Sequence, residues 1–354
     1  MKTLSPELHA YLLEGTVIPA HPLALDAARQ LSEKHQRALT RYYLSADAGG
    51  VAVGVHTTQF AIRNPEHRLY EKVLSLAAEE VKRANLARPF LKIAGVSGDT
   101  AAAVQEAKIA ADLGYDLALV STNGLGAWEE SALLDRARAI GEFMPLFGFY
   151  LQPAVGGREL SFDFWRQFAE IPSVYAVKIA PFNRYQTLEV VRAICHSPRR
   201  DQIALYTGND DNIIADLLTT YQVRVKGAVV EKPIVGGLLG HWAVWTRTAV
   251  EHFQRIKTFR ENRSPIPPQM LSLNIAITDA NAAFFDVAHQ FKGCIAGIHE
   301  VLRRQGLMEG TWCLDPEEQL SQGQMEAIDR IYSDYPDLND DAFVQRHLGR
   351  WMGA

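Results

Sequence analysis

Short apolar segments rich in β-branched residues alternate with longer segments of helical period between residue 15 and about residue 262. This alternation repeats eight times, which is typical of a parallel sheet whose strands are connected by helices. Each short segment is apolar enough to be buried on both faces. We predict strands at Thr16–Ala20, Gly50–His56, Phe90–Gly95, Leu117–Ser121, Leu146–Leu151, Val174–Ala180, Ile203–Thr207 and Val225–Val230. Eight such units predict an α/β protein with a closed (β/α)8 TIM barrel.

The pattern changes after Arg263, where the proline-rich segment SPIPP interrupts the chain. From Gln269 onward only helical periodicity is present. We therefore expect a barrel over residues 1–263 and a C-terminal helical extension, packed on the barrel, over residues 264–354.

Composition narrows the classes of ligand and location. A formal net charge of −5 and no cluster of basic residues argue against a nucleic-acid partner. No apolar run approaches the ~20 residues of a membrane span, and the charged N-terminal segment does not resemble a secretion signal. Three widely spaced cysteines indicate neither a disulfide framework nor a zinc site. We expect a cytoplasmic protein that binds small molecules.

In a barrel of this kind the active site lies at the carboxyl ends of the strands. Lys178 lies within the apolar segment Val174–Ala180, near its end, where a buried ammonium is costly unless it is paired or neutral. Desolvation lowers the pKa of a lysine, and the neutral amine can attack a carbonyl carbon to form an imine. A lysine that reaches solvent or pairs with a carboxylate fits this position equally well. Strand context alone does not select Lys178, because other lysines lie in or beside predicted strands, namely Lys92, Lys226 and Lys232.

Several short motifs follow the predicted strands in order, namely His56-Thr57-Thr58-Gln59-Phe60, Gly95-Val96-Ser97-Gly98-Asp99-Thr100, Phe149-Tyr150-Leu151-Gln152-Pro153, Val177-Lys178 and Gly208-Asn209-Asp210-Asp211. Tyr150 and Lys178 are 28 positions apart. The order and spacing resemble those of the dihydrodipicolinate synthase and N-acetylneuraminate lyase family of class I aldolases, over most of the barrel. That family carries Gly-Thr-Thr-Gly-Glu after strand two, Tyr-Asn-x-Pro at strand five and an imine-forming lysine on strand six.

The resemblance implies a role for each matching residue. Lys178 would be the nucleophile, Tyr150 the hydroxyl that transfers protons to and from the carbinolamine, and Thr57 the relay partner of Tyr150. Thr58 and Gln59 would bind the carboxylate of a 2-oxo acid. Without the resemblance, Tyr150 is an ordinary packed aromatic residue, and the threonine pair caps a turn.

This chain departs from the family pattern at several positions. Phe60 replaces the glutamate and His56 the first glycine of the strand-two motif, and Thr122-Asn123-Gly124 replaces the aromatic pair after strand four. The tyrosine–threonine–tyrosine relay is therefore incomplete. Val155 lies where lysine-biosynthetic members have an arginine for a second carboxylate, so the dihydrodipicolinate synthase reaction itself is disfavoured. Other arginines on loops are candidates for such a clamp, namely Arg63, Arg158 and Arg184.

Two histidines and one valine complete the candidate substrate-binding residues. His21 and His56 end neighbouring predicted strands, where they could act as acid or base near neutral pH or shape the pocket by hydrogen bonds. Val229 lies on the predicted eighth strand. The sequence has no metal-binding or nucleotide-binding motif, so we expect neither a metal nor a cofactor.

Three functions remain open. The first is a lyase that makes or breaks a carbon–carbon bond between pyruvate, or a related 2-oxo acid, and an aldehyde. The second is a dehydratase of a sugar-derived 2-oxo acid that uses the same lysine imine. The third is a barrel that binds a 2-oxo acid without turnover. The resemblance also implies a homo-oligomer, either a dimer or a tetramer.

Overall fold

The computed structural model describes residues 2–353. The chain divides into two compact units, each built from two separate stretches of sequence. The first unit comprises the residues up to Thr16 together with Pro89–Leu238, and the second comprises Val17–Arg88 together with the residues from Leu239 on.

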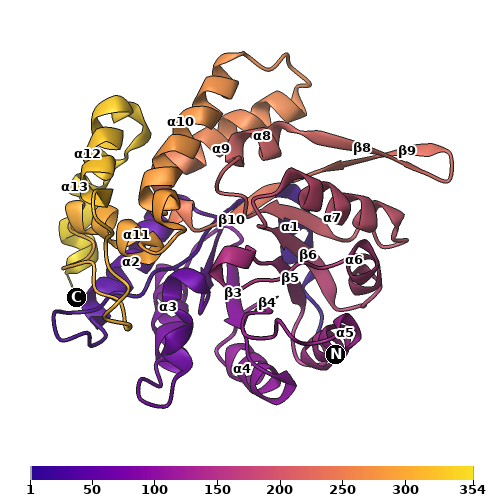
Figure 1. The fold of residues 1–354 in the computed structure, drawn as a ribbon, viewed down its shortest axis with the longest axis horizontal. Helices are drawn as coiled ribbons and strands as arrows, with labels where there is room; N and C mark the ends of the chain where they lie inside the picture. Colours follow the sequence, from indigo (N-terminus) through magenta and orange to yellow (C-terminus); the bar gives the residue numbers. More distant parts are fainter. Residues whose placement is uncertain (1, 354) are drawn as a thin grey trace. The chain divides into compact units, whose positions relative to one another are not determined.

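The first unit contains most of the parallel strands and the helices between them (Figure 1). Helix α1 (Pro6–Glu14) precedes the strands in the sequence. Each strand of this unit pairs in parallel with its neighbour in the sheet. The strands are β3 (Leu91–Val96), β4 (Leu117–Val120), β5 (Leu146–Tyr150), β6 (Val174–Ile179), β7 (Ala204–Thr207) and β10 (Gly236–Leu239). The connecting helices are α4 (Thr100–Asp112), α5 (Glu130–Gly141), α6 (Phe162–Ala169), α7 (Arg184–His196) and α8 (Ile213–Leu218).

The second unit contains two strands and the C-terminal helices. Strands β1 (Val17–Pro19) and β2 (Gly50–Val53) are followed by α2 (Glu33–Ser45) and α3 (Tyr70–Ala84), respectively, and a parallel bridge joins Ala20 to Ala52. The remaining helices are α9 (Thr246–Glu261), α10 (Gln269–Phe284), α11 (Cys294–Arg304), α12 (Gln324–Asp334) and α13 (Asp341–Met352).

The eight parallel strands belong to one sheet in the order β1-β10-β7-β6-β5-β4-β3-β2. Parallel strands that alternate with helices in this way form a (β/α)8 TIM barrel, and helices α10 to α13 follow it in the sequence. The predicted fold class is therefore confirmed. Among the described residues, no helix is both long and apolar enough to span a membrane.

The predicted eighth strand is wrong. Residues 225–230 form the closed end of an antiparallel hairpin, β8 (Thr220–Val225) and β9 (Ala228–Pro233), and the parallel partner of β7 is instead β10. Lys226 and Gly227 both have positive φ (48° and 87°), as a tight two-residue hairpin turn requires. Two β-branched runs around such a turn pair with each other and are not buried on both faces. Figure 1 shows the hairpin extending past α7, away from the strands of its own unit.

Candidate active site

Lys178 lies near the carboxyl end of β6, with its side chain only 7% exposed. It is in register with Phe149 on β5 and Tyr206 on β7, so the three side chains lie on the same face of the sheet. The amine lies 4.3 Å from the centroid of the Phe149 ring, within the range of a cation–π contact.

Two opposing effects set the pKa of this lysine. Burial disfavours the ammonium form and lowers the pKa of Lys178 to about 8, whereas the carboxylate of Asp210 acts in the opposite direction. A substantial fraction of the amine is therefore neutral near physiological pH, and a neutral amine is the form that attacks a carbonyl carbon.

Gly208 gives the lysine its space. A Cβ atom at this position would lie 2.4 Å from Cε of Lys178 and 2.7 Å from Cβ of Ala180. The amide of Gly208 also donates to the Ile179 carbonyl at 2.7 Å, which holds the start of the loop against β6. The glycine of this motif is thus explained by the close approach of the lysine side chain.

The loop that carries Asp210 is anchored by the buried carboxylate of Asp216 on α8. This carboxylate accepts hydrogen bonds from Oγ1 of Thr207 at 2.7 Å and Nδ2 of Asn209 at 3.0 Å. Arg184 also donates to Asp216 and forms an ion pair with it. Asn209 in turn accepts a bond from the Phe182 amide at 3.0 Å. This network fixes the loop between β7 and α8, and with it the position of Asp210.

Tyr150 has other partners than the lysine. Its hydroxyl accepts a hydrogen bond from the Leu160 amide at 3.3 Å, and its ring lies 5.4 Å from that of Trp165 on α6. Gly148 lies on the same face of β5 as Tyr150, since a Cβ placed there would contact Phe168 and Trp165. The aromatic ring next to the Lys178 amine is that of Phe149. A hydroxyl that accepts one hydrogen bond can still donate its proton and accept another, so the bond from Leu160 does not exclude a relay through Tyr150.

Two serines share the face of the sheet that carries Lys178. Strand alternation places Ser97, after β3, and Ser121, after β4, in line with Phe149 and Lys178. Both are buried, and Oγ of Ser121 accepts a bond from the Asn123 amide at 3.1 Å. Both serines lie in segments that the sequence marks, but neither was assigned a role; the period-two alternation within the predicted strands would have indicated their shared face.

In the second unit, the threonine pair and His21 lie together. Thr57 and Thr58 form the short 3-10 turn with His56, and both hydroxyls donate to the carbonyl of His21, at 3.3 Å and 2.6 Å. The Thr58 hydroxyl also accepts bonds from the amides of Gly54 and Val55. Thr58 thus holds the turn together, as a threonine that caps a turn does.

His21 is fully buried and has structural partners. Its Nε2 lies 2.9 Å from Oγ1 of Thr40, and its Nδ1 lies 3.0 Å from the side-chain Nε2 of Gln36. Burial lowers the pKa of His21 to about 4, so the ring is neutral at physiological pH. The expectation that His21 titrates near neutrality is therefore wrong, because the sequence did not show that helix α2 covers it. His56 is half-buried, with its ring 6.0 Å from that of Phe60.

Gln59 connects the turn to the C-terminal part of the second unit. It adopts a positive φ of 67°, and its Oε1 accepts a hydrogen bond from the Leu314 amide at 2.6 Å. Its buried Nε2 has no hydrogen-bond partner among the described residues. The family has a glycine at this position, and here the longer side chain fixes the segment around Cys313, whose carbonyl also accepts a bond from Arg29.

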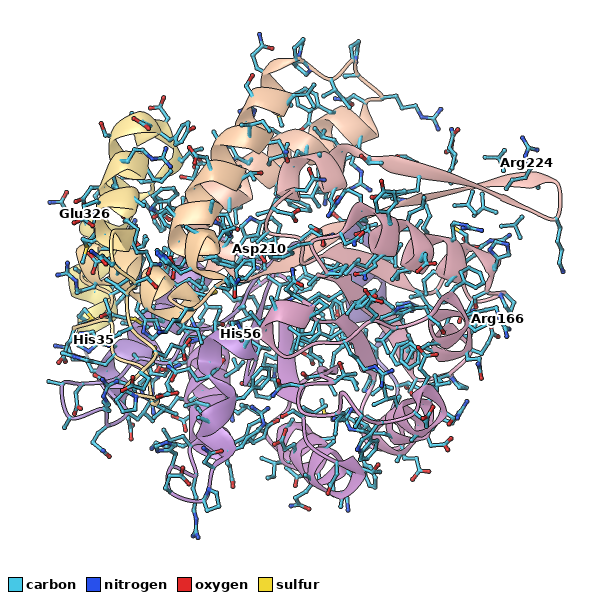
Figure 2. The ribbon with its side chains drawn as sticks, in the orientation of Figure 1. His35, His56, Arg166, Asp210, Arg224 and Glu326 are labelled. Atoms are coloured by element: carbon cyan, nitrogen blue, oxygen red, sulfur yellow. The ribbon has the colours of Figure 1, made fainter. Side chains whose placement is uncertain are left out.

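Val229 lies outside any site formed by the parallel strands. It pairs with Arg224 in the antiparallel hairpin, and its side chain is 51% exposed. Figure 2 shows Arg224 far out on the hairpin and well apart from Asp210. The expectation that Val229 contacts substrate depended on the wrong eighth strand and is corrected with it.

The candidate arginine clamps are engaged elsewhere. Arg158 donates to the carbonyls of Trp128 and Glu159, Arg63 donates to the Gly54 carbonyl, and Arg184 pairs with Asp216. Among the residues that the structure describes, no group of three or more histidine, cysteine, aspartate or glutamate side chains is arranged to hold a metal ion.

The fold and the buried lysine at the end of β6 place the chain among (β/α)8 barrels with a lysine at the carboxyl end of a strand. No protein-family model matches the sequence, and no characterised protein matches it in a sequence search. Solved structures with similar folds include dihydrodipicolinate synthase from Acinetobacter baumannii, complexed with pyruvate, with a TM-score of 0.72 and 18% identity over 91% of this chain and 99% of that one.

Two further solved structures agree with it. N-acetylneuraminate lyase from Fusobacterium nucleatum has a TM-score of 0.69 and 18% identity, covering 91% of this chain and 99% of its own. Dihydrodipicolinate synthase from Oceanobacillus iheyensis has a TM-score of 0.71 and 15% identity, with 93% and 99% covered. The resemblance inferred from the motifs is thus confirmed at the level of the fold.

Proposed function

We propose that this chain is a Schiff-base-forming lyase that makes or breaks a carbon–carbon bond between pyruvate, or a related 2-oxo acid, and an aldehyde. The observation that carries the proposal is Lys178, a buried amine with a lowered pKa at the carboxyl end of a barrel strand. The similar fold of a dihydrodipicolinate synthase that binds pyruvate supports the choice of substrate.

The chemistry begins with attack of the neutral Lys178 amine on the keto carbon of the 2-oxo acid. The tetrahedral adduct loses water to form the imine, which requires proton transfer to the leaving hydroxyl. The protonated imine then withdraws electrons from the neighbouring carbon, so that carbon can lose a proton and attack an aldehyde. Hydrolysis of the imine releases the product and returns the free amine.

We retain the other residue roles as parts of the proposal. Tyr150 transfers protons with Thr57 as its relay partner, and Thr58 and Gln59 bind the carboxylate. His56 faces the second substrate. Asp210 is added on the strength of its interaction with Lys178, because a carboxylate stabilises the protonated imine as it stabilises the ammonium. Val155 and the engaged arginines argue against an aldehyde partner that carries a second carboxylate.

Reductive trapping tests the proposal. Incubation with pyruvate followed by borohydride should add the reduced ligand to Lys178, and peptide mass spectrometry locates the adduct. Lys178→Met should abolish the adduct. Lys232 is the internal control: it is also buried, but its amine donates to the carbonyls of Arg200 and Ile203, so it should stay unlabelled. An adduct on Lys232 and not on Lys178, or no adduct with any 2-oxo acid, would overturn the proposal.

Product analysis then separates the reaction types. Release of pyruvate from a larger 2-oxo acid supports the lyase, loss of water indicates the dehydratase, and an adduct without any product indicates a binding protein. We also propose a cytoplasmic location, because the three cysteines, Cys195, Cys294 and Cys313, are free and buried, as is usual in a reducing compartment.

A further inference from the structure

Three residues that line one small cavity in the first unit each carry a buried polar atom without a partner. The cavity lies between the ends of β4 and β5 and helices α5 and α6, and its volume is about 10 Å³. Its lining includes Thr122, Arg136 and Trp165, which are 6%, 1% and 1% exposed. Oγ1 of Thr122, Nη2 of Arg136 and Nε1 of Trp165 have no hydrogen-bond partner among the described residues. Unsatisfied buried polar atoms are uncommon, so three at one cavity require an explanation.

The charge of Arg136 is also uncompensated at short range. Its Nε donates to the Gly98 carbonyl at 2.9 Å, and no described carboxylate forms an ion pair with it. Glu106 and Asp99 act on it only at longer range, and burial lowers the pKa of Arg136 to about 10. The guanidinium therefore remains positively charged at neutral pH inside an apolar wall, where an unpaired charge is strongly destabilising.

The chemistry of the cavity fits an anion. Arginine and tryptophan nitrogens can only donate hydrogen bonds, and a threonine hydroxyl can donate as well. The remaining lining is aliphatic and aromatic, as with Leu133 and Phe164. The space leaves room for one small particle, such as a water molecule or a monatomic ion, and for no organic ligand. A water molecule in the cavity would find few acceptors for its own hydrogens, and it would not neutralise the charge of Arg136.

We propose that this cavity binds a chloride ion, held by the Arg136 guanidinium, the Trp165 indole N–H and the Thr122 hydroxyl. A bound anion satisfies all three donors and neutralises the buried cation. It also connects the end of β4 to α5 and α6, and through Arg136 to the turn at Gly98 after β3. The proposal does not depend on the proposed function, since none of its residues takes part in imine formation.

Bromide replaces chloride and scatters anomalously, so crystals grown in sodium bromide test the site directly. We expect an anomalous peak within hydrogen-bonding distance of the three donor atoms. A fully occupied water molecule with no anomalous signal in the cavity would overturn the proposal.

Thermal unfolding provides a second test. At equal ionic strength, Tm should be higher in sodium chloride than in sodium gluconate, by ~2 °C or more, and should saturate with chloride concentration. Thr122→Val keeps the side-chain shape but removes one donor, and should reduce this chloride-dependent shift. Thr207→Val removes a buried hydroxyl that bonds to Asp216, and should lower Tm in both salts while keeping the shift. Equal Tm values in the two salts for the unmodified protein would contradict the proposal.

Discussion

At the scale of single residues, the reactivity of Lys178 depends on a balance between burial and one carboxylate. Burial favours the neutral amine, and Asp210 favours the ammonium. The Phe149 ring also attracts the ammonium form, because a cation over an aromatic face is stabilised. With a pKa of about 8, the lysine gains nucleophilicity with increasing pH in the range where most enzymes work.

The first prediction concerns this balance. The rate of borohydride trapping by pyruvate should increase with pH as the amine loses its proton, with a midpoint near pH 8 and a plateau at higher pH. Asp210→Asn removes the group that raises the lysine pKa, so the midpoint should move to lower pH. Asp211→Asn is the matched control: Asp211 interacts with Arg184, so the midpoint should stay in place. An unchanged midpoint in Asp210→Asn would show that Asp210 does not raise the pKa of Lys178.

The second prediction concerns Gly208. Gly208→Ala places a methyl group 2.4 Å from Cε of Lys178, so the lysine side chain must move. We expect at least a ~10-fold loss of trapping rate, because displacement of a nucleophile by about 1 Å is enough for losses of this size. Gly126→Ala is the control, since nothing lies within 4 Å of its added Cβ. Equal trapping rates in the two variants would show that the lysine does not need this space.

The third prediction concerns the Tyr150 hydroxyl. If it transfers protons, Tyr150→Phe should reduce turnover by about 10²-fold or more while the protein remains folded, because only the hydroxyl is removed. We expect this result from the spacing to Lys178. Turnover within about twofold of the unmodified protein would instead show that the hydroxyl does not transfer protons and serves only as an acceptor for the Leu160 amide.

The sequence identified Lys178 because an ammonium interrupts an otherwise apolar strand. It did not identify Asp210 as the carboxylate that acts on it, nor Phe149 as its partner on β5, because these depend on how neighbouring strands and loops align. The register between β5 and β6 shifts after Leu146, and no local pattern predicts such an irregularity.

At the scale of secondary-structure elements, seven of the eight barrel strands could be predicted and the eighth could not. Strand β10 begins with Gly236-Gly237, which lack the β-branched character of a strand. A Cβ atom at Gly236 would lie 2.6 Å from the Tyr206 ring and 2.5 Å from the Thr16 carbonyl, so packing, not propensity, selects glycine there. The neighbouring hairpin has the stronger β-pattern and was therefore mistaken for the strand.

The fourth prediction follows from the hairpin. Val229→Ser should leave the trapping rate unchanged and change the free energy of unfolding by less than about 0.5 kcal/mol, because the side chain is 51% exposed. Chemical denaturation and the trapping assay measure the two quantities. A clear loss of trapping with an unchanged Tm would restore the predicted role of Val229 in substrate binding.

At the scale of the whole molecule, we propose the exposed apolar residues of α10 as a surface for self-association. Leu271 and Ile275 are one helical turn apart and are 62% and 64% exposed. Apolar patches of this kind often mark protein–protein contacts. This agrees with the expectation that the protein is a dimer or tetramer.

The fifth prediction tests that expectation. Light scattering at micromolar concentration should show a closed homo-oligomer, and Leu271→Glu combined with Ile275→Glu should shift the population toward smaller species. Val229→Ser, which changes an exposed apolar residue on the hairpin, should leave the oligomer intact. A monomeric unmodified protein would contradict the prediction without affecting the chemistry of Lys178.

The division of the chain into two units has a consequence for the order in which the protein folds on the ribosome. The second unit needs Val17–Arg88, made early, and the residues from Leu239 on, made last. The main part of the first unit, Pro89–Leu238, is completed in between. At about 5–20 residues per second, translation of the remaining 116 residues takes roughly 6–23 s. During that interval Lys178 and its strand are already made, whereas the early strands β1 and β2 still lack the C-terminal helices of their own unit.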